Sequence, residues 1–320
     1  MVIKKILIIG GFGYLGSHLS SFFFKKGYHV DVFSKSKLKH FQNYNKLILG
    51  NILNQDDLKS ILQYKYDLVL NLISLDKNDS KINSINAGKI NVLSKLNVLD
   101  LLSKKNNPKL YINFSTIHVY SKNNKLNHED SLTEPDSEYA MTHLISEKFT
   151  SLFYKNQFKC ISIRLSNSYG APHLIYSKSW DLVVNNFCLM AYKKNNIIIN
   201  SDGQGYIDFI YIKDICEGVF FLVNNYNKLE NQVYNLTSFK SVKILTLAKK
   251  VSDIYEKRYK KEVKIKIKNS IGKHSNYKKE YSNIKINELG FKINYTLGEG
   301  INEIFDFLDK NGKLDNNGKR

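Results

Sequence analysis

The sequence predicts an α/β fold in which a doubly wound parallel sheet carries helices on both faces. Short apolar runs without alternation, such as residues 6–9, are typical of strands that are buried on both sides. Segments of helical period follow these runs in turn, which is the order of βαβ units. The 320 residues are 42% hydrophobic and 24% charged, which suffices for one large or two closely linked domains with a complete core.

The individual elements can be assigned in chain order. Apolar runs bounded by glycine or polar residues predict strands at 6–9, 29–33, 47–49, 67–73, 110–115 and 160–165. Apolar residues at helical spacing predict helices at 17–26, 56–63, 85–104 and 139–154. Beyond Pro172 the pattern is looser and predicts a helix near 180–192, a strand at 197–199 and a helix at 213–223. The lysine-rich stretch 243–285 still alternates around 263–267 and is expected to fold, whereas 315–320 is expected to be a disordered end.

The basic charge of the chain raises the question of a nucleic-acid partner. Lys and Arg number 48 against 29 Asp and Glu, which gives a net charge of +19. Only three of these cations are arginine, the usual reader of bases (Arg164, Arg258 and Arg320). We therefore interpret most of the charge as a lysine bias on solvated faces that also attracts polyanionic ligands, and we expect no nucleic-acid partner.

Cysteines and apolar segments limit the remaining classes of protein. Cys160, Cys188 and Cys216 are well separated and match neither a disulfide framework nor a metal-binding spacing, so no metal is expected. No apolar run approaches the ~20 residues that span a bilayer. The expectation is a cytoplasmic protein without a membrane partner.

A glycine-rich segment joins the first predicted strand to the first predicted helix. Gly10, Gly13 and Gly16 allow a tight turn, a close approach of the backbone to a pyrophosphate, and packing of the helix on the sheet. The helix N-terminus adds free N–H groups and a partial positive charge. Because a strand precedes and a helix follows, the segment predicts a Rossmann-type dinucleotide site.

The spacing G-x-x-G-x-x-G differs from the G-x-G-x-x-G of most dehydrogenases. It resembles the extended short-chain dehydrogenase/reductase superfamily, the NAD(P)-dependent sugar-nucleotide epimerases and dehydratases. Further segments match motifs of that family in the same order along the chain: Gly50-Asn51-Ile52, Asn71-Leu72-Ile73-Ser74, Asn91-Val92, 114–120, 164–172, Tyr234-Asn235-Leu236 and Glu288-Leu289-Gly290-Phe291. The resemblance implies cofactor contacts from Gly10, Phe12, Gly13, Tyr14, Leu15, Gly16, Ser34, Lys35, Asn51, Ile52, Leu72, Ile73, Ser74, Asn91, Ser115, Tyr139, His143 and Leu165.

The end of the second strand bears on the choice of cofactor. An acid there normally binds the adenosine ribose of NAD. Here the position is Ser34, followed by Lys35 and Lys37, while Asp31 lies in mid-strand. A hydroxyl and ammonium groups can accept a 2′-phosphate that an acid would repel, so the sequence favours NADP over NAD. The alternative is that both lysines are ordinary surface residues and that NAD binds without the acid.

The resemblance also implies the catalytic residues. Hydride transfer at a sugar carbon requires proton exchange with the adjacent hydroxyl, which a tyrosine of lowered pKa can perform. In the family a Tyr-x-x-x-Lys pair does this, and the lysine also holds the nicotinamide ribose. This chain has Tyr139, but His143 replaces the lysine. Thr116 matches the Ser/Thr that hydrogen-bonds the reacting oxygen.

The replacement by His143 leaves three interpretations open. The histidine does the work of the lysine with a different pH profile. Alternatively, the positive charge of the nicotinamide tunes the tyrosine and His143 only orients it. In the third interpretation the protein binds a dinucleotide without turnover.

The two residues that follow Thr116 bear on which reaction the enzyme catalyses. In sugar 4,6-dehydratases an Asp-Glu pair follows this threonine, whereas this chain has Ile117 and His118. Dehydration is therefore disfavoured. His118 is a possible additional acid or base that faces the substrate, or else a histidine at the strand end.

The substrate side is less well defined. The resemblance places substrate contacts at Thr116, Asn167, Trp180, Asn186 and Tyr206. Trp180 could stack on a base or anchor the core. The family often has an arginine for the substrate diphosphate where this chain has Ile207, so Lys178 or Tyr206 would have to replace it.

The sequence thus predicts an epimerase or oxidoreductase for a nucleotide-activated sugar, acting at C4 as a 4-epimerase or 4-keto reductase in surface-glycan precursor synthesis. The alternatives are an impaired dinucleotide-binding or sensor protein and, less favoured, an RNA-binding relative. A Rossmann-type domain is expected at 1–172, also taking about 206–225, with a smaller C-terminal α/β substrate-binding domain at 173–205 and 226–320. A homodimer is expected through helices 85–104 and 139–154, with Leu93, Leu96, Leu99 and Leu101 on the apolar face.

Overall fold

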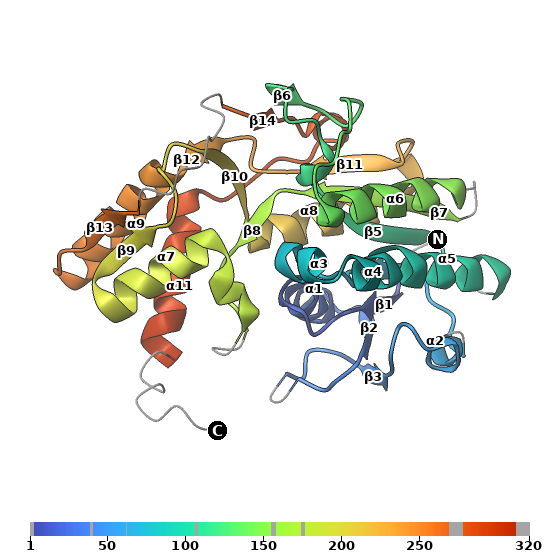
Figure 1. Ribbon diagram of the computed structural model, residues 1–320. Helices are drawn as coiled ribbons and strands as arrows, with labels where there is room; N and C mark the ends of the chain where they lie inside the picture. Colours follow the sequence, from blue (N-terminus) through green and yellow to red (C-terminus); the bar gives the residue numbers. More distant parts are fainter. Residues whose placement is uncertain are drawn as a thin grey trace.

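A computed structural model describes residues 3–38, 41–61, 63–105, 108–154, 158–173, 177–268 and 278–311. Figure 1 shows a larger lobe built around a central sheet and a smaller lobe beside it. The predicted disordered end at 315–320 lies outside the described residues.

The central sheet of the larger lobe has seven strands within the described part of the chain. They follow the order β11-β7-β5-β4-β1-β2-β3, and every neighbouring pair is parallel. The strand order reverses between β1 and β4. In such sheets, ligands bind at this point, outside the carboxyl ends of the strands. The predicted doubly wound parallel sheet is confirmed. Its strands are β1 (Lys5–Ile9), β2 (His29–Ser34), β3 (Lys46–Leu49), β4 (Leu68–Asn71), β5 (Leu110–Thr116), β7 (Lys159–Leu165) and β11 (Val233–Leu236).

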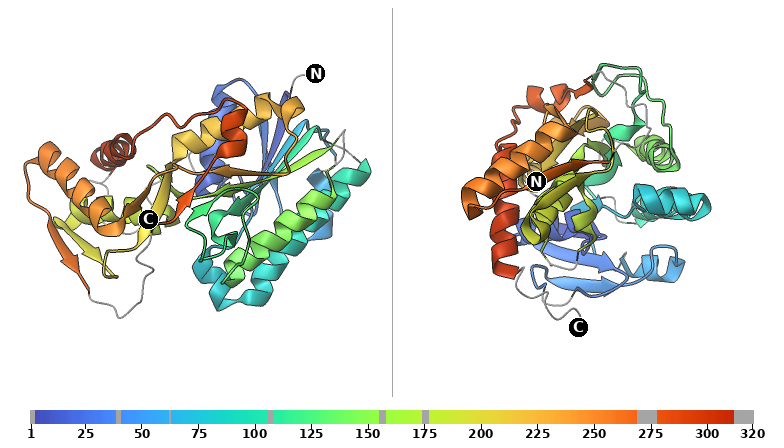
Figure 2. Two further views of the ribbon diagram at one scale, coloured as in Figure 1. Left: turned by 90° about the horizontal axis from the view of Figure 1, so that it is seen from above. Right: turned by 60° about the vertical axis from the view of Figure 1, so that its left-hand side comes forward.

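Both faces of this sheet are covered by helices (Figure 2). Ile6 and Ile8 of β1 pack in one apolar cluster with residues of α1 (Tyr14–Lys25) and α8 (Ile212–Asn224). Leu7 and Ile9 pack in another cluster, with residues of helices on the opposite face. These four side chains have no exposed surface, which explains why the run does not alternate. The helices of the second face are α2 (Gln55–Ile61), α5 (Ser94–Lys105) and α6 (Glu138–Leu152).

The predicted helix 85–104 is not a single α-helix. The chain forms α3 (Lys77–Ile82), α4 (Ser84–Ala87), a π-helical segment at Gly88–Leu93 and then α5. The carboxylate of Asp76 caps α3 at the Asp79 N–H, and the Asn83 amide caps α4. A π-segment changes the phase of the side chains that follow it, and apolar periodicity alone does not reveal this change.

The smaller lobe combines short strands with three long helices. A three-stranded sheet contains β8 (Asn167–Tyr169), β10 (Tyr206–Tyr211) and β12 (Ser241–Lys243), and β9 (Asn196–Ile199) pairs with β13 (Lys264–Ile267). Strands β8, β10 and β12 are too short or too mixed in composition for prediction from periodicity. The helices are α7 (Val183–Lys194), α9 (Ile244–Tyr259) and α11 (Leu297–Asn311).

The chain passes between the lobes more often than the expected boundaries suggest. Strand β11 belongs to the central sheet, although 226–320 was expected in the second domain. The sequence predicts 206–225 in the first domain, but strand β10 of this stretch belongs to the small sheet. Helix α8, the other part of the stretch, packs on α1 of the larger lobe. Farther along, β14 (Glu280–Tyr281) pairs with β6 (Leu126–Asn127), and α10 (Ile284–Glu288) contacts β11. Apart from these segments, the two-domain division remains a proposal.

Candidate active site

The glycine turn has the geometry of a phosphate cradle. Gly10 has a φ of +81°, and its carbonyl accepts a hydrogen bond of 3.0 Å from the Gly13 N–H. A Cβ atom on Gly16 would lie 2.2 Å from the Gly10 oxygen, so the first turn of α1 can pack on the turn only without a side chain. Helix α1 starts at Tyr14, earlier than predicted, and the N–H groups at the very start of a helix lack intrahelical acceptors. The turn therefore fits the pyrophosphate of a dinucleotide.

Side chains of the glycine turn pack against and hydrogen-bond to other parts of the chain. Phe12 packs against Phe41 and Tyr44, with ring centroids 5.8 and 5.4 Å away. The Tyr14 hydroxyl donates to the Gly170 carbonyl at 3.0 Å, which ties the turn to the chain after β8. Leu15 is half-buried.

The carboxyl ends of the central strands bring further predicted residues to the same edge of the sheet. Register pairs Ile9 with Asn71 and Thr116 with Leu165. Ile73, just beyond β4, would contact a Cβ atom on Gly10 at 3.1 Å. Leu72, Ile73 and Leu165 are half-buried and Ser74 is exposed, so all four can contribute to a ligand site.

The adenosine end of the predicted site lies beyond β2 and β3. Ser34 is half-buried at the end of β2, and Lys35 is exposed. Asp31 is fully buried, and its carboxylate is held by Lys5, His29 and Tyr66, so it cannot reach a ribose. Beyond β3, Asn51 is exposed, whereas the Ile52 side chain is 1% exposed in the core, so only its backbone remains for a cofactor contact.

The three predicted catalytic residues lie together. Tyr139 and His143 are on α6 with ring centroids 4.5 Å apart, and the side chain of Thr116 at the end of β5 lies close enough to the Tyr139 hydroxyl to act on its pKa. The His143 Nε2 atom and the Ser74 hydroxyl are 3.0 Å apart, which links α6 to the loop after β4. Tyr139 is half-buried, whereas Thr116 and His143 are buried.

Burial governs the protonation of both rings on α6. It raises the pKa of Tyr139, against which the hydrogen bond from Thr116 acts, and the charge of Asp76 raises it further. Burial lowers the pKa of His143 well below its ordinary value, and the positive charge of Lys95 adds to this effect. His143 is therefore neutral at physiological pH and provides a hydrogen bond without a full charge.

His118 also lies near Tyr139. Its ring centroid is 6.2 Å from that of Tyr139, and the residue keeps an exposed surface. The surrounding protein, and after it the charge of Lys77, lower the pKa of His118 to about 4. Ile117 is buried, so the two positions after Thr116 provide no carboxylate.

Two predicted cofactor residues act from behind the site. Asn91 has no exposed surface; its amide donates to Thr142 at 3.0 Å and accepts from the Leu75 N–H at 2.7 Å. Ser115 is 5% exposed and donates to Glu147. Both are therefore placed to position the loop after β4 and helix α6, and direct contact of either side chain with a cofactor stays a prediction.

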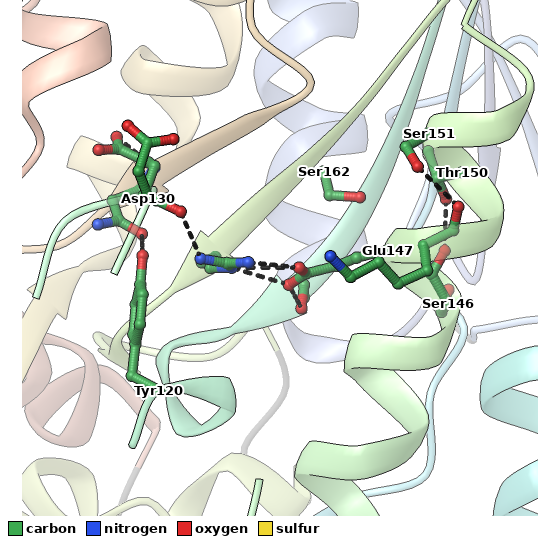
Figure 3. Close-up of polar contacts among 12 residues, drawn as sticks. Tyr120, Asp130, Ser146, Glu147, Thr150, Ser151 and Ser162 are labelled. Atoms are coloured by element: carbon green, nitrogen blue, oxygen red, sulfur yellow. Dashed lines mark hydrogen bonds and ion pairs between the residues drawn. The ribbon is translucent and has the colours of Figure 1, made fainter. Parts of the chain in front are cut away.

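A buried ion pair supports α6 from the sheet side. The Arg164 guanidinium donates to both carboxylate oxygens of Glu147, with Nη2 and Oε2 at 2.8 Å, and these side chains are 4% and 2% exposed. Figure 3 shows Glu147 reaching from its helix into this pair, with Tyr120 on the opposite side. The Arg164 guanidinium carbon lies 4.7 Å from the centre of the Tyr120 ring. The pair fixes the position of α6 against β7.

Lys95, which no sequence pattern singles out, is buried between α5 and β5. Its ammonium donates to Asn113 Oδ1 at 2.7 Å and to the Phe114 carbonyl at 3.2 Å. A lysine in an amphipathic segment normally faces solvent, and without knowledge of the π-segment before α5 no signal indicated otherwise.

The predicted substrate residues are only partly brought together. Asn167 donates to the Asp208 carbonyl at 3.0 Å and remains half-buried, as does Tyr206. Trp180 is 9% exposed and packs on Phe307, with ring centroids 6.1 Å apart, which favours its role as a core anchor over base stacking. The Asn186 amide donates to the Trp180 carbonyl at 3.1 Å.

Other features of the described residues lie apart from this site. A pocket of about 560 Å³ is lined by residues of α1, α8 and α11 and contains none of the predicted site residues. No group of three or more His, Cys, Asp or Glu side chains within the described ranges could hold a metal ion. Across the same ranges, no helix has the length and apolar character for crossing a membrane.

The site can now be assigned to a class. The glycine cradle follows β1 and Thr116 ends β5, so the cradle and the Thr116–Tyr139 pair lie at the same edge of the sheet, as in an extended short-chain dehydrogenase/reductase. The family model "NAD dependent epimerase/dehydratase family" matches residues 6–237. The chain belongs to this NAD-dependent epimerase/dehydratase family.

Individual relatives support the same assignment. A putative UDP-glucose 4-epimerase of Methanocaldococcus jannaschii is 23% identical, with 96% of this chain and 99% of that protein covered. A dTDP-D-glucose 4,6-dehydratase of Dictyostelium discoideum is 28% identical, covering 79% of this chain but only 63% of that protein. The crystal structure of a UDP-glucuronic acid 4-epimerase from Bacillus cereus, in complex with UDP-glucuronic acid and NAD, has a TM-score of 0.79, 21% identity and coverage of 96% and 99%. This last likeness supports the fold.

Proposed function

We propose that this protein is a nicotinamide-dependent epimerase of a nucleotide-activated sugar that acts at C4. The observation that carries the proposal is the Thr116–Tyr139 pair, which lies at the same carboxyl edge of the sheet as the glycine cradle. A phenol held there can exchange a proton with a hydroxyl of the sugar. The sugar carbon that carries this hydroxyl would then face the bound dinucleotide. The nearly full-length coverage of the Methanocaldococcus relative supports epimerisation.

The chemistry divides between the cofactor and the chain. A bound nicotinamide supplies the reversible acceptance of hydride from the sugar carbon. Tyr139 would remove the hydroxyl proton and later return it, and Thr116 would orient the reacting oxygen. Because burial raises the pKa of Tyr139, this role requires the positive charge of the bound nicotinamide to favour the phenolate. His143 and Ser74, whose side chains lie 3.0 Å apart, would hold the ribose of the cofactor.

A dehydratase or a keto-sugar reductase would need other features. Elimination of water is disfavoured because Ile117 and His118 provide no carboxylates, although one relative is a named dehydratase. A reductase would require exchange of the dinucleotide after each turnover. Asn167 and Tyr206 are proposed substrate contacts, and the product would serve the synthesis of surface-glycan precursors.

The cofactor favoured is NADP, in keeping with the residues after β2. Ser34 ends that strand, Lys35 and Lys37 are exposed beyond it, and the buried Asp31 is occupied by other partners. An anionic 2′-phosphate would meet a hydroxyl and two ammonium groups. The solved relative named above contains NAD, so NAD binding is the alternative.

We also propose that the protein forms a homodimer through α3, α4 and α6. Six large apolar side chains of this region are at least 37% exposed, namely Ile82, Ile85, Leu93, Met141, Ile145 and Leu152. Of the four leucines expected on the dimer face, Leu99 is instead fully buried against the sheet. Exposed apolar strips of this kind mark interaction surfaces.

One experiment tests the central proposal. Purified protein is incubated with a panel of nucleotide sugars and their keto derivatives, with each dinucleotide, and the products are identified by mass and by sugar NMR. We expect a 4-epimer from at least one substrate without net consumption of cofactor, and loss of this product by at least about a hundredfold in Tyr139→Phe. Net oxidation of NADPH would instead identify a reductase, and dinucleotide binding without turnover of any sugar would identify a sensor protein.

A further inference from the structure

Ser115 is a buried serine on β5, directly before Thr116. Its side chain is 5% exposed, and its hydroxyl donates a hydrogen bond to Glu147 Oε1 on α6. A serine has one hydroxyl proton to donate, so this bond commits it. The role of this side chain therefore depends on what Glu147 holds.

Glu147 joins α6 to two neighbouring strands. Its carboxylate accepts from Ser115 of β5 and, through both oxygens, from Arg164 of β7. The Arg164 guanidinium is fixed in turn, because its Nη1 atom donates to the Glu129 carbonyl at 3.0 Å. Hydrogen bonds to ionised groups are short and directional, and Glu147 reaches from the helix into this buried cluster (Figure 3). The carboxylate therefore has a defined place relative to both strands.

The bond between Ser115 and Glu147 joins the two elements that carry the predicted catalytic pair. Ser115 precedes Thr116 on β5, and Glu147 lies about two turns after Tyr139 on α6. Thr116 is oriented locally, because its Oγ1 atom accepts from the His118 N–H at 3.2 Å. The approach of Thr116 to Tyr139 therefore depends on how closely α6 is held against the end of β5.

A weaker link between β5 and α6 runs beside this bond. Ser146 donates to Asn113 Oδ1 at 3.4 Å, so Asn113 and Ser115, alternate residues of β5, both face α6. This link joins uncharged groups over a longer distance, whereas the acceptor of Ser115 is a carboxylate that Arg164 holds in place. The Ser115–Glu147 bond is therefore the stronger of the two.

We propose that Ser115 is a positioning residue for the active site: its hydrogen bond to Glu147 sets the separation between the end of β5 and α6. The approach of Thr116 to Tyr139 follows from this separation. This role differs from the predicted contact with the cofactor, because it requires the Ser115 hydroxyl to remain on Glu147. The consequence for catalysis rests on the proposed function, whereas the consequence for the surroundings of Tyr139 does not.

The test is NMR on the whole protein without cofactor, with isotope-labelled tyrosine rings. The Tyr139 signals are assigned as those missing in Tyr139→Phe. In Ser115→Ala, which removes only the donor, we expect the Tyr139 signals to move or broaden beyond the linewidth, because the approach of Thr116 is loosened. Ser115→Cys, whose thiol fills the same place but is a weak donor, should act in the same direction and replaces Ser115→Ala should that variant not fold.

Ser252→Ala is the matched control. Ser252 lies on α9 in the smaller lobe and is 6% exposed, and its hydroxyl also donates to a glutamate carboxylate, that of Glu256, at 3.0 Å. Loss of this bond should leave the Tyr139 signals unchanged. Unchanged Tyr139 signals in Ser115→Ala, or equal changes in both variants, would overturn the proposal.

A second measurement separates positioning from cofactor binding. Ser115→Ala should lower kcat by roughly tenfold or more, while the KM for the sugar and the dissociation constants of NADPH and NADH stay within about twofold. Weaker dinucleotide binding with unchanged Tyr139 signals would overturn the proposal and support the predicted cofactor contact. If the unmodified protein turns over no sugar, the proposed function fails, but the NMR comparison still decides the role of Ser115.

Discussion

Tyr139 and His143 lie one turn apart on α6, with their rings edge to face and the centroids 4.5 Å apart. The i, i+4 spacing puts both side chains on one face of the helix. A cation at the second position would favour the phenolate, whereas a neutral imidazole offers only its hydrogen bond. Of the interpretations of His143 drawn from the sequence, the structure thus supports an orienting role more than a charged one.

The neutrality of His143 predicts acid sensitivity of the fold. Its pKa is lowered in the folded state, so at acid pH the unfolded chain binds the proton more readily. Stability should be highest above about pH 6.5 and fall as the pH decreases below this value. Thermal unfolding followed by circular dichroism from pH 7.5 to 5 should show this loss, and His143→Gln should reduce it. Identical pH dependence in both proteins would contradict the prediction.

The glycine cradle predicts a sharp difference between two Gly→Ala changes. In Gly16→Ala the new methyl group would clash with the Gly10 carbonyl, so we expect loss of dinucleotide binding and a lower melting temperature. Gly88→Ala is the matched control, because nothing lies within 4 Å of its added Cβ atom. The control should be neutral or stabilising by up to about 1 kcal/mol. Fluorescence titration with NADPH and NADH measures the binding.

The buried pair of Arg164 and Glu147 predicts a large stability effect. Glu147→Gln leaves the Arg164 charge uncompensated in the interior that also holds Lys95, and should cost roughly 3–5 kcal/mol of unfolding free energy. Arg258→Met, which removes exposed contacts to Asp306 and Asp309, should cost less than about 1 kcal/mol. Urea unfolding measures both, and comparable losses would contradict the distinction.

The residues at the end of β2 suggest a substitution that should change the cofactor preference. Ser34→Asp would place a carboxylate where the 2′-phosphate is proposed to bind. Affinity for NADPH should fall by about tenfold or more, equivalent to about 1.4 kcal/mol, while affinity for NADH is kept or improved. Ser36→Asp, two residues farther along, is the control. Equal dissociation constants for NADPH in the unmodified protein and Ser34→Asp would favour NAD as the natural cofactor.

The exposed apolar strip predicts a change of assembly. Ile145→Asp on α6 should convert a dimer to a monomer in sedimentation or light-scattering measurements. Ile284→Asp changes an equally apolar residue, 48% exposed but on α10 outside the strip, and should leave the mass unchanged. A monomeric unmodified protein would remove the basis for the proposed dimer.

The central sheet could be predicted from local patterns, because each buried strand is a short apolar run. The helices that cover it could be predicted because their apolar residues recur at helical spacing. The glycine turn, Thr116 and Tyr139 were likewise recognisable from motifs. The strands of the small sheet were not, since they are only three to six residues long and are defined by distant partners. Lys95 escaped prediction because its burial depends on the phase change in the π-segment and on acceptors supplied by β5.

The chain returns from the small lobe to the large one, and this path has a consequence for fragments of the protein. Strand β11 covers β7, and α8 covers α1, yet both come from the second half of the sequence. A product ending at 172 would expose the hydrogen-bonding edge of β7 and an apolar face of α1, so it would be a substrate for proteases rather than a functional module. The larger lobe is therefore complete only when residues from both halves of the sequence are present.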